Sequence, residues 1–188
     1  MGNGLTINQK VLVWARGQMG KQVGSGECYD LADRALGKSG AQSAPDYGEI
    51  TDDADYQWGE SVDDAKDAQP GDIVQFRDYE VTTTVVTVTR TTKADGSYTE
   101  QTKTEDKTVK RPHHTAVINA KKAGGVVEVL EQNAPPSGKK VQTHNVQTQD
   151  SDKTETSSSQ KGTTKTTVTK TTSVSVSGSM WIYRPQSK

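Results

Sequence analysis

Apolar residues recur at helical spacing in the first segment of the chain, residues 5–20. Apolar side chains three or four positions apart face the same side of a helix that packs on a core. Thr6 or Asn8 is suited to cap the start of this helix, and Gly20 is suited to end it. The pattern therefore predicts an amphipathic helix near the N-terminus.

A second segment with this spacing, residues 27–36, follows the glycine-rich turn at residues 24–26. Its predicted inner face consists of Cys28, Leu31, Ala32, Ala35 and Leu36. Gly37 is a natural stop, because glycine tolerates the left-handed conformation that ends many helices. The sequence thus predicts a second helix that carries Cys28 in its first turn.

Extended structure is predicted farther along the chain. Residues 38–70 are polar and read as a long loop, and Pro70-Gly71 is a turn signal. Short apolar runs predict strands at residues 72–76, 115–120, 126–132 and 180–185. Helices followed by a run of strands are typical of an α+β domain.

Two threonine-rich tracts interrupt this pattern, at residues 80–110 and 150–178. Asp95-Gly96 and Gly162 lie near their middles and predict a turn between two strands in each tract. Threonine favours extended structure, but few side chains in the tracts are apolar enough to form a core. We therefore predict one domain over residues 1–188 with two long polar β-hairpin insertions, which could pair with each other. Partial disorder of the second tract is the alternative.

Composition narrows the classes of function. The chain has 188 residues, a formal net charge of −1 and 30% hydrophobic residues, which suits one small domain. A net charge near zero gives no argument for a nucleic-acid partner, and no run approaches the ~20 apolar residues of a membrane span. The N-terminus lacks the apolar segment of a signal peptide. We expect no cofactor.

The single cysteine, Cys28, is the first candidate for chemistry, and it excludes an internal disulfide. At a helix N-terminus the helix dipole and unpaired backbone N–H groups stabilise a thiolate and lower the thiol pKa. Gly26 would let a substrate carbonyl approach the backbone, where the N–H of Cys28 could donate to an oxyanion. The side-chain amide of Gln22 could supply a second donor. A buried, inert helix thiol is the alternative reading.

A base is needed to activate such a thiol, and His114 directly precedes the strand predicted at 115–120. Its neighbour His113 would point to the opposite side of an extended segment, so one of the two histidines is expected to be a bystander. A metal site is not expected, because adjacent histidines do not share a face and His144 with one cysteine matches no recognised ligand spacing.

Polar residues that end the strand predicted at 126–132 could orient the base. Glu131 and Asn133 are two positions apart and would share one side of that strand. Either could accept a hydrogen bond from the imidazole and fix its tautomer, as the third member of a catalytic triad does. An ordinary polar strand end is the alternative reading.

The order of these segments resembles the CHAP branch of the NlpC/P60 and papain-like superfamily of cysteine amidohydrolases and peptidases. The segments are Gln22 with Cys28 at a helix start, PGDIVQF at 70–76, HTAVI at 114–118, VLEQN at 129–133 and WIYRP at 181–185. The resemblance covers the chain in pieces and skips both threonine-rich tracts.

In that family the helix that bears the nucleophile packs on an antiparallel sheet, so the resemblance implies a papain-like α+β fold. It implies Cys28 as nucleophile, His114 as base, Glu131 or Asn133 as the orienting residue and Gln22 as an oxyanion donor. Family grooves often use aromatic residues, which are scarce here. The expected substrate contacts are Gly26, Tyr29 and Trp58, with Tyr56 and Trp181 as further candidates.

The usual substrate of the family implies cleavage of amide bonds in peptidoglycan, by an N-acetylmuramoyl-L-alanine amidase or a peptide-stem endopeptidase. A bacterial cell envelope or a secreted location would follow, although the chain shows no signal peptide and the cytoplasm stays open. One alternative is a papain-like protease or exported toxin that acts on a protein. The other is a non-enzymatic adhesion module that binds a protein partner along the edges of the hairpins.

Overall fold

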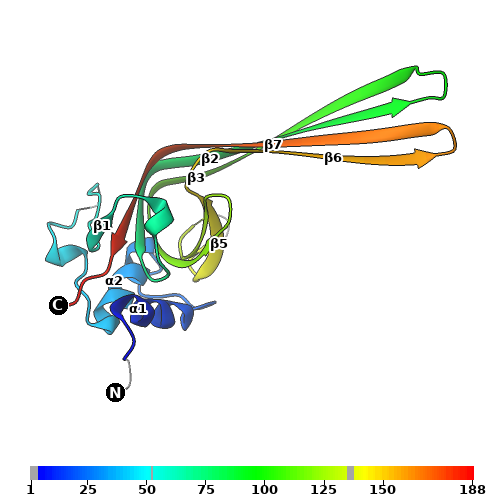
Figure 1. The fold of residues 1–188 in the computed structure, drawn as a ribbon. Coiled ribbons are helices and arrows are strands. Elements are labelled where there is room, and N and C mark those ends of the chain that lie inside the picture. The colour runs from blue at the N-terminus through cyan, green and yellow to red at the C-terminus, as the bar shows by residue number, and fades with distance from the viewer. Residues whose placement is uncertain (1–3, 52, 135–137) are drawn as a thin grey trace. The chain divides into compact units, whose positions relative to one another are not determined.

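The computed structural model describes residues 4–51, 53–134 and 138–188 (Figure 1). Contacts divide the chain into two compact units. Unit 1 consists of Met1–Tyr79, Lys110–Thr148 and Ser177–Lys188. Unit 2 consists of Glu80–Val109 and Gln149–Val176. Unit 1 contains both helices and every residue of the candidate site.

Helix α1 (Ile7–Arg16) begins at a capping box. The Thr6 hydroxyl accepts a hydrogen bond from the Gln9 N–H, and the Gln9 side chain accepts one from the Thr6 N–H. Thr6 is therefore the cap. The helix ends at Gly17, so the predicted stop at Gly20 is wrong; Gly20 adopts a positive φ in the turn that follows.

Helix α2 (Cys28–Ser39) begins at Cys28, which confirms that this residue lies in the first turn. Glu27 occupies the N-cap position without a side-chain cap. The helix runs past Gly37 and ends at Gly40, whose φ of 74° is the left-handed conformation that glycine adopts without strain. Neither described helix is long and apolar enough to cross a membrane.

One sheet contains all the strands. They are β1 (Glu60–Val62), β2 (Ile73–Thr92), β3 (Tyr98–Lys122), β4 (Val126–Glu131), β5 (Gln142–Gln147), β6 (Ser151–Lys161) and β7 (Thr164–Arg184). Their order is β1-β7-β2-β3-β4-β5, and β6 pairs with β7. The pairs β1–β7, β3–β4, β4–β5 and β6–β7 are antiparallel. The predicted α+β class is confirmed.

The segments between the helices and the sheet are more ordered than the sequence pattern predicts. Residues 38–70, read as a loop, contain β1 and two short 3₁₀ helices, η1 (Ala44–Asp46) and η2 (Ala65–Asp67). Strand β5 was not predicted either, because its alternation is weak and only Val146 is buried. β5 nevertheless pairs along its whole length with β4, and this pairing places His144 opposite Val129.

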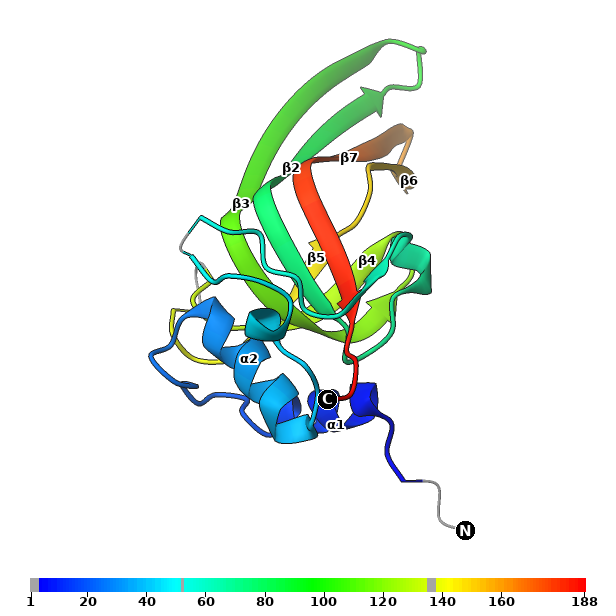
Figure 2. The same cartoon turned by 90° about the vertical axis from the view of Figure 1, so that its left-hand side faces the viewer.

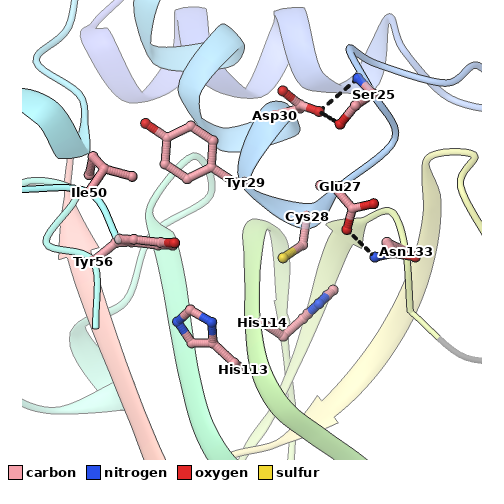
Figure 3. A pocket seen from close by; sticks show the side chains of 10 residues that line it. All are labelled: Ser25, Glu27, Cys28, Tyr29, Asp30, Ile50, Tyr56, His113, His114 and Asn133. Carbon is pink, nitrogen blue, oxygen red and sulfur yellow. Dashed lines mark hydrogen bonds between the residues drawn. The ribbon is translucent and has the colours of Figure 1, made fainter. Parts of the chain in front are cut away.

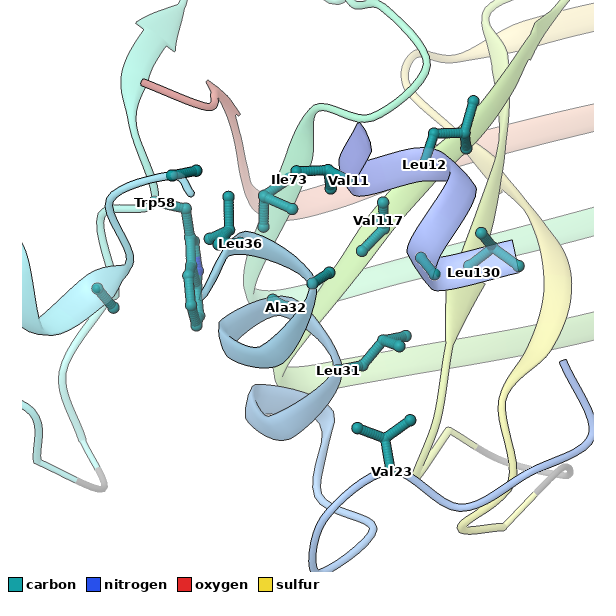
Figure 4. Packing of buried hydrophobic residues seen from close by; sticks show 14 of the residues in the cluster. Val11, Leu12, Val23, Leu31, Ala32, Leu36, Trp58, Ile73, Val117 and Leu130 are labelled. Carbon is teal, nitrogen blue, oxygen red and sulfur yellow. The ribbon is translucent and has the colours of Figure 1, made fainter. Parts of the chain in front are cut away.

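The core of unit 1 lies between the two helices and one face of the sheet (Figures 2 and 4). Val11 of α1 and Leu31 of α2 are completely buried there. The sheet contributes Ile73 from β2, Val117 from β3 and Leu130 from β4. Because α2 is packed along its apolar face, its first turn, which carries Cys28, is held rigidly over the sheet.

Positive φ angles occur in β2 and β7 close to the residues at which unit 1 ends. Asp78 has a φ of 50° and Gly178 a φ of 82°. A Cβ atom at Gly178 would overlap the backbone carbonyl of Asp78, so the two backbones approach as closely as only glycine allows.

Unit 2 contains the threonine-rich strand segments. β6 and β7 pair in register from Ser151 with Val174 to Lys161 with Thr164. Threonine hydroxyl groups meet across this pair, with 3.2 Å between Thr154 and Thr171. None of the buried hydrophobic residues lies in unit 2. Backbone pairing and cross-strand hydroxyl contacts, rather than an apolar core, therefore stabilise this unit.

Candidate active site

A pocket of about 430 Å³ opens beside the first turn of α2 (Figure 3). Its lining residues are Ser25, Glu27, Cys28, Tyr29, Asp30, Ile50, Tyr56, His113, His114 and Asn133. The fold therefore brings Cys28 and His114, the predicted nucleophile and base, to the same pocket from α2 and β3.

Cys28 and His114 both line the pocket. The His114 ring is 5% exposed and lies against Phe76, with 6.1 Å between the ring centroids. Burial raises the pKa of the Cys28 thiol, but interactions with the His114 side chain and with the backbone of Thr115 and Tyr29 outweigh it and lower the pKa. These surroundings favour a negative charge on the sulfur.

Glu131 occupies the orienting position. Its Oε2 lies 2.9 Å from Nε2 of His114, and its side chain is fully buried. Because Nε2 faces the carboxylate, Nδ1 is the ring nitrogen that faces Cys28. The order thiol, imidazole, carboxylate is that of a catalytic triad.

Asn133, the other residue considered for this position, does not contact the histidine. Its Nδ2 donates to Oε2 of Glu27 over 2.6 Å. It lies beyond the end of β4 and has a φ of 58°, so the strand alternation that would align it with Glu131 is lost. Asn133 instead lines the pocket mouth next to the first turn of α2.

The electrostatics favour an ion pair between the thiol and the imidazole. Burial opposes charge on both groups, but their mutual hydrogen bond and charge outweigh it. The pKa of Cys28 is consequently lowered from its ordinary value. The pKa of His114 is raised to about 9, since its interactions with the Cys28 thiolate and the Glu131 carboxylate, both acceptors, stabilise the imidazolium against the effect of burial.

Two further residues bind Glu131, and sequence reasoning assigned neither to the site. Arg111 donates from Nε and Nη2 to the two carboxylate oxygens over 3.0 and 2.5 Å. Nδ1 of His144 lies 2.7 Å from Oε1. A buried carboxylate needs a cationic partner. Once Glu131 is assigned to the protein interior, a buried cationic residue such as Arg111 is therefore expected beside it.

His113 and His114 both lie in β3, and both line the pocket. Nε2 of His113 donates to the carbonyl of Ala54 over 2.9 Å, whereas His114 contacts Glu131. The two adjacent histidines therefore have different partners at the same pocket.

Gln22 and Gly26 lie outside the set of residues that line the pocket. The exposed Gln22 side chain donates from Nε2 to the carbonyl of Gly24 over 3.4 Å. Gly26 is buried with a φ of 92°, and a Cβ there would crowd Lys139 as well as Gln22. The backbone N–H of Cys28 lies in the first turn of α2, where N–H groups have no partner within the helix.

Of the aromatic residues expected to contact substrate, Tyr29 and Tyr56 line the pocket, and Trp58 and Trp181 do not. The prediction for Trp58 is wrong, because its side chain is fully buried and Nε1 donates to Oε1 of Gln75 over 3.1 Å. Trp58 supports the wall from behind, with its ring 5.2 Å from Tyr29 and 5.8 Å from Tyr56. Tyr56 provides the second aromatic surface of the pocket.

Gln132, between Glu131 and Asn133, fixes the loop that precedes Cys28. Its buried side chain accepts from the Val23 N–H over 3.0 Å and donates to the carbonyls of Val23 and Glu27 over 2.9 and 2.6 Å. The end of β4 thereby sets the position at which α2 begins. Sequence reasoning gave this residue no role.

Gln132→Leu should lower both the stability and the reactivity of the protein. The change keeps the side-chain size but leaves buried peptide groups of Val23 without partners, so we expect the free energy of unfolding to fall by about 2–4 kcal/mol. Urea unfolding measures this loss. Gln147→Leu is the matched control, because Oε1 of Gln147 is buried without a hydrogen-bond partner among the described residues. An equal loss in both variants would contradict the assigned role.

Among the described residues, no group of three or more His, Cys, Asp and Glu side chains is arranged to hold a metal ion. The pocket presents the thiol of Cys28 and the imidazole of His114, and the buried carboxylate of Glu131 contacts the imidazole. These groups are of the types used in nucleophilic catalysis at a carbonyl carbon.

Comparison with known families supports the fold. The family model described as the AIM3/BBC1 cysteine proteinase-fold domain matches residues 4–188. No curated protein and no solved structure matched the chain. The match includes the threonine-rich tracts, and its description gives a cysteine proteinase fold without specifying the CHAP or NlpC/P60 branch. The chain therefore belongs to the AIM3/BBC1 cysteine proteinase-fold domain family.

Proposed function

We propose that this domain is a cysteine hydrolase that cleaves amide bonds through a thioester acyl-enzyme. The observation that carries the proposal is that Cys28 and His114 line one pocket and that Nε2 of His114 lies 2.9 Å from the buried carboxylate of Glu131. The cysteine proteinase fold of the family supports it.

In the first half of the reaction, the Cys28 sulfur attacks the carbonyl carbon and His114 donates its proton to the departing amine, so that the C–N bond breaks. In the second half, His114 takes a proton from water, the hydroxide attacks the thioester, and the carboxylic acid leaves with the thiol restored. The Cys28 N–H at the start of α2 donates to the oxyanion in both halves. Glu131 stabilises the imidazolium.

A polypeptide is the substrate class that the pocket supports best. Tyr29, Tyr56 and Ile50 form an apolar surface opposite the thiol, and Ile50 is 38% exposed. An apolar side chain next to the scissile bond would cover this surface. The second candidate is an amide bond of peptidoglycan, supported by the resemblance of the motif order to the CHAP family.

Trapping the acyl-enzyme tests the proposal and separates the two substrate classes. The protein is mixed with a library of internally quenched peptides or with purified peptidoglycan fragments, quenched in acid and analysed by mass spectrometry. We expect an acyl adduct on the peptide that contains Cys28 and release of an amine product. Adducts formed only with peptidoglycan fragments would select the second class. Amine release without any adduct on Cys28 would contradict the mechanism.

The pH dependence of hydrolysis should follow the ion pair. Activity rises with pH as Cys28 ionises, which its lowered pKa shifts to the acidic side of an ordinary thiol. Activity falls again above pH about 9, because His114, with a pKa of about 9, then loses the proton that it must donate. Measurement of kcat/KM across pH checks this bell shape. A profile that only begins to rise near the ordinary thiol pKa of about 8.5 would refute the ion pair.

A further inference from the structure

Behind the catalytic histidine, Arg111 and Glu131 form a buried ion pair. The side chain of Arg111 is 5% exposed and that of Glu131 is 0% exposed. The guanidinium donates from Nε to Oε2 over 3.0 Å and from Nη2 to Oε1 over 2.5 Å. Such a bidentate ion pair fixes the plane of the carboxylate as well as its distance from the guanidinium.

Each oxygen of Glu131 contacts two nitrogens. Oε1 contacts Arg111 and His144, and Oε2 contacts Arg111 and His114. The carboxylate is therefore fully hydrogen-bonded in one orientation, and that orientation directs Oε2 at Nε2 of the catalytic histidine.

The charge of Arg111 complements the charges of the site. Arginine stays protonated at all relevant pH values, whereas burial by itself favours the protonated form of a carboxyl group. The pKa of Glu131 is lowered below its usual range, since hydrogen bonds and charge from His114 and Arg111 outweigh its burial. With Arg111 present, the ionised forms of Cys28, His114, Glu131 and Arg111 sum to zero charge.

Aromatic rings hold the guanidinium in place. Its carbon lies 5.7 Å from the ring centroid of Phe76 and 6.0 Å from that of Tyr79. Phe76 also stacks against His114. Arg111 and the catalytic base are therefore packed against the same side chain.

We propose that Arg111 is a positioning residue that keeps Glu131 ionised and oriented, so that Glu131 stabilises the imidazolium of His114 and thereby the Cys28 thiolate. The inference rests on the proposed function, because it assigns a fourth member to the same site. Arg111 itself touches neither the thiol nor the pocket.

The test is the pH profile of Cys28 alkylation by iodoacetamide, read together with thiolate absorbance, neither of which needs a substrate. Arg111→Gln should move the midpoint of thiolate formation upward by about 1–2 pH units, since the site loses one positive charge. Alkylation near pH 6 should then slow by about tenfold or more. Arg111→Lys should keep the midpoint but lower the rate, because lysine supplies the charge without the two parallel bonds.

Arg184→Gln is the matched control. Arg184 also pairs with a fully buried carboxylate, Asp72, over 3.1 Å, away from the pocket residues. Its replacement should lower stability without moving the thiolate midpoint. This separates a positioning role from a merely structural one.

The outcomes separate this inference from the proposed function. Absence of a low-pH thiolate in the unaltered protein would refute the proposed function. A low-pH thiolate that keeps its midpoint in folded Arg111→Gln would refute the role of Arg111 alone. If Arg111→Gln does not fold, Arg111→Lys decides, since an unaltered alkylation rate in that variant would overturn the positioning role.

Discussion

The Cys28→Ala variant is expected to lose amide hydrolysis by a factor of about 10⁴ or more, because the sulfur is the atom that forms the acyl-enzyme. The fold should remain intact. Cys28 is half-buried at the start of α2, where alanine favours the helix and the change removes a single heavy atom. Hydrolysis assays and circular dichroism of the purified variant check both statements.

Ser25→Ala is the control for this experiment. Ser25 also lines the pocket, but its hydroxyl donates to Oδ2 of Asp30 over 2.6 Å and contacts no base. Its replacement should leave most of the hydrolysis. Full activity in Cys28→Ala would show that another group is the nucleophile and would end the proposed mechanism.

The His114→Ala variant is expected to convert Cys28 into an ordinary or even less acidic thiol. Burial raises the pKa of Cys28, and the contacts that offset this effect come first from His114. Alkylation by iodoacetamide near pH 6 should therefore slow by about 10²-fold, and hydrolysis should fall by about 10³-fold or more. Mass spectrometry of the alkylated protein across pH measures the first effect.

His113→Ala supplies the matched control in the same strand and the same pocket. His113 binds the carbonyl of Ala54 and lies 5.3 Å from the ring of Tyr56, but it does not contact the thiol. The pH profile of Cys28 alkylation in His113→Ala should follow that of the unaltered protein. An equal slowing in both variants would mean that the effect is a general disturbance of the pocket.

The start of α2 and the place of His114 were accessible from the sequence because both depend on local signals. A glycine-rich turn before a helical repeat placed Cys28 in the first turn. A histidine at the head of an apolar run placed His114 in the sheet. The choice between Glu131 and Asn133 was not accessible, since it depends on the positive φ of Asn133 beyond the end of β4.

Other parts of the site depend on pairings that the sequence does not display. The burial of Trp58 follows from its hydrogen bond with Gln75 on β2. The place of Arg111 beside Glu131 follows from the pairing of β3 with β4, which the spacing of residues along one strand does not predict. The family was also out of reach, because the resemblance pointed to the CHAP branch, whereas the matching family model is described only by its cysteine proteinase fold.

The thiol and the groups that activate it lie far apart along the chain, and synthesis separates them in time. Cys28 is made first, His114 follows as part of β3, and Glu131 comes at the end of β4. At ordinary translation rates Glu131 is added roughly 5–20 s after Cys28. Until then the cysteine lacks the two side chains that are proposed to activate it. The complete site can therefore form only once β4 has been made.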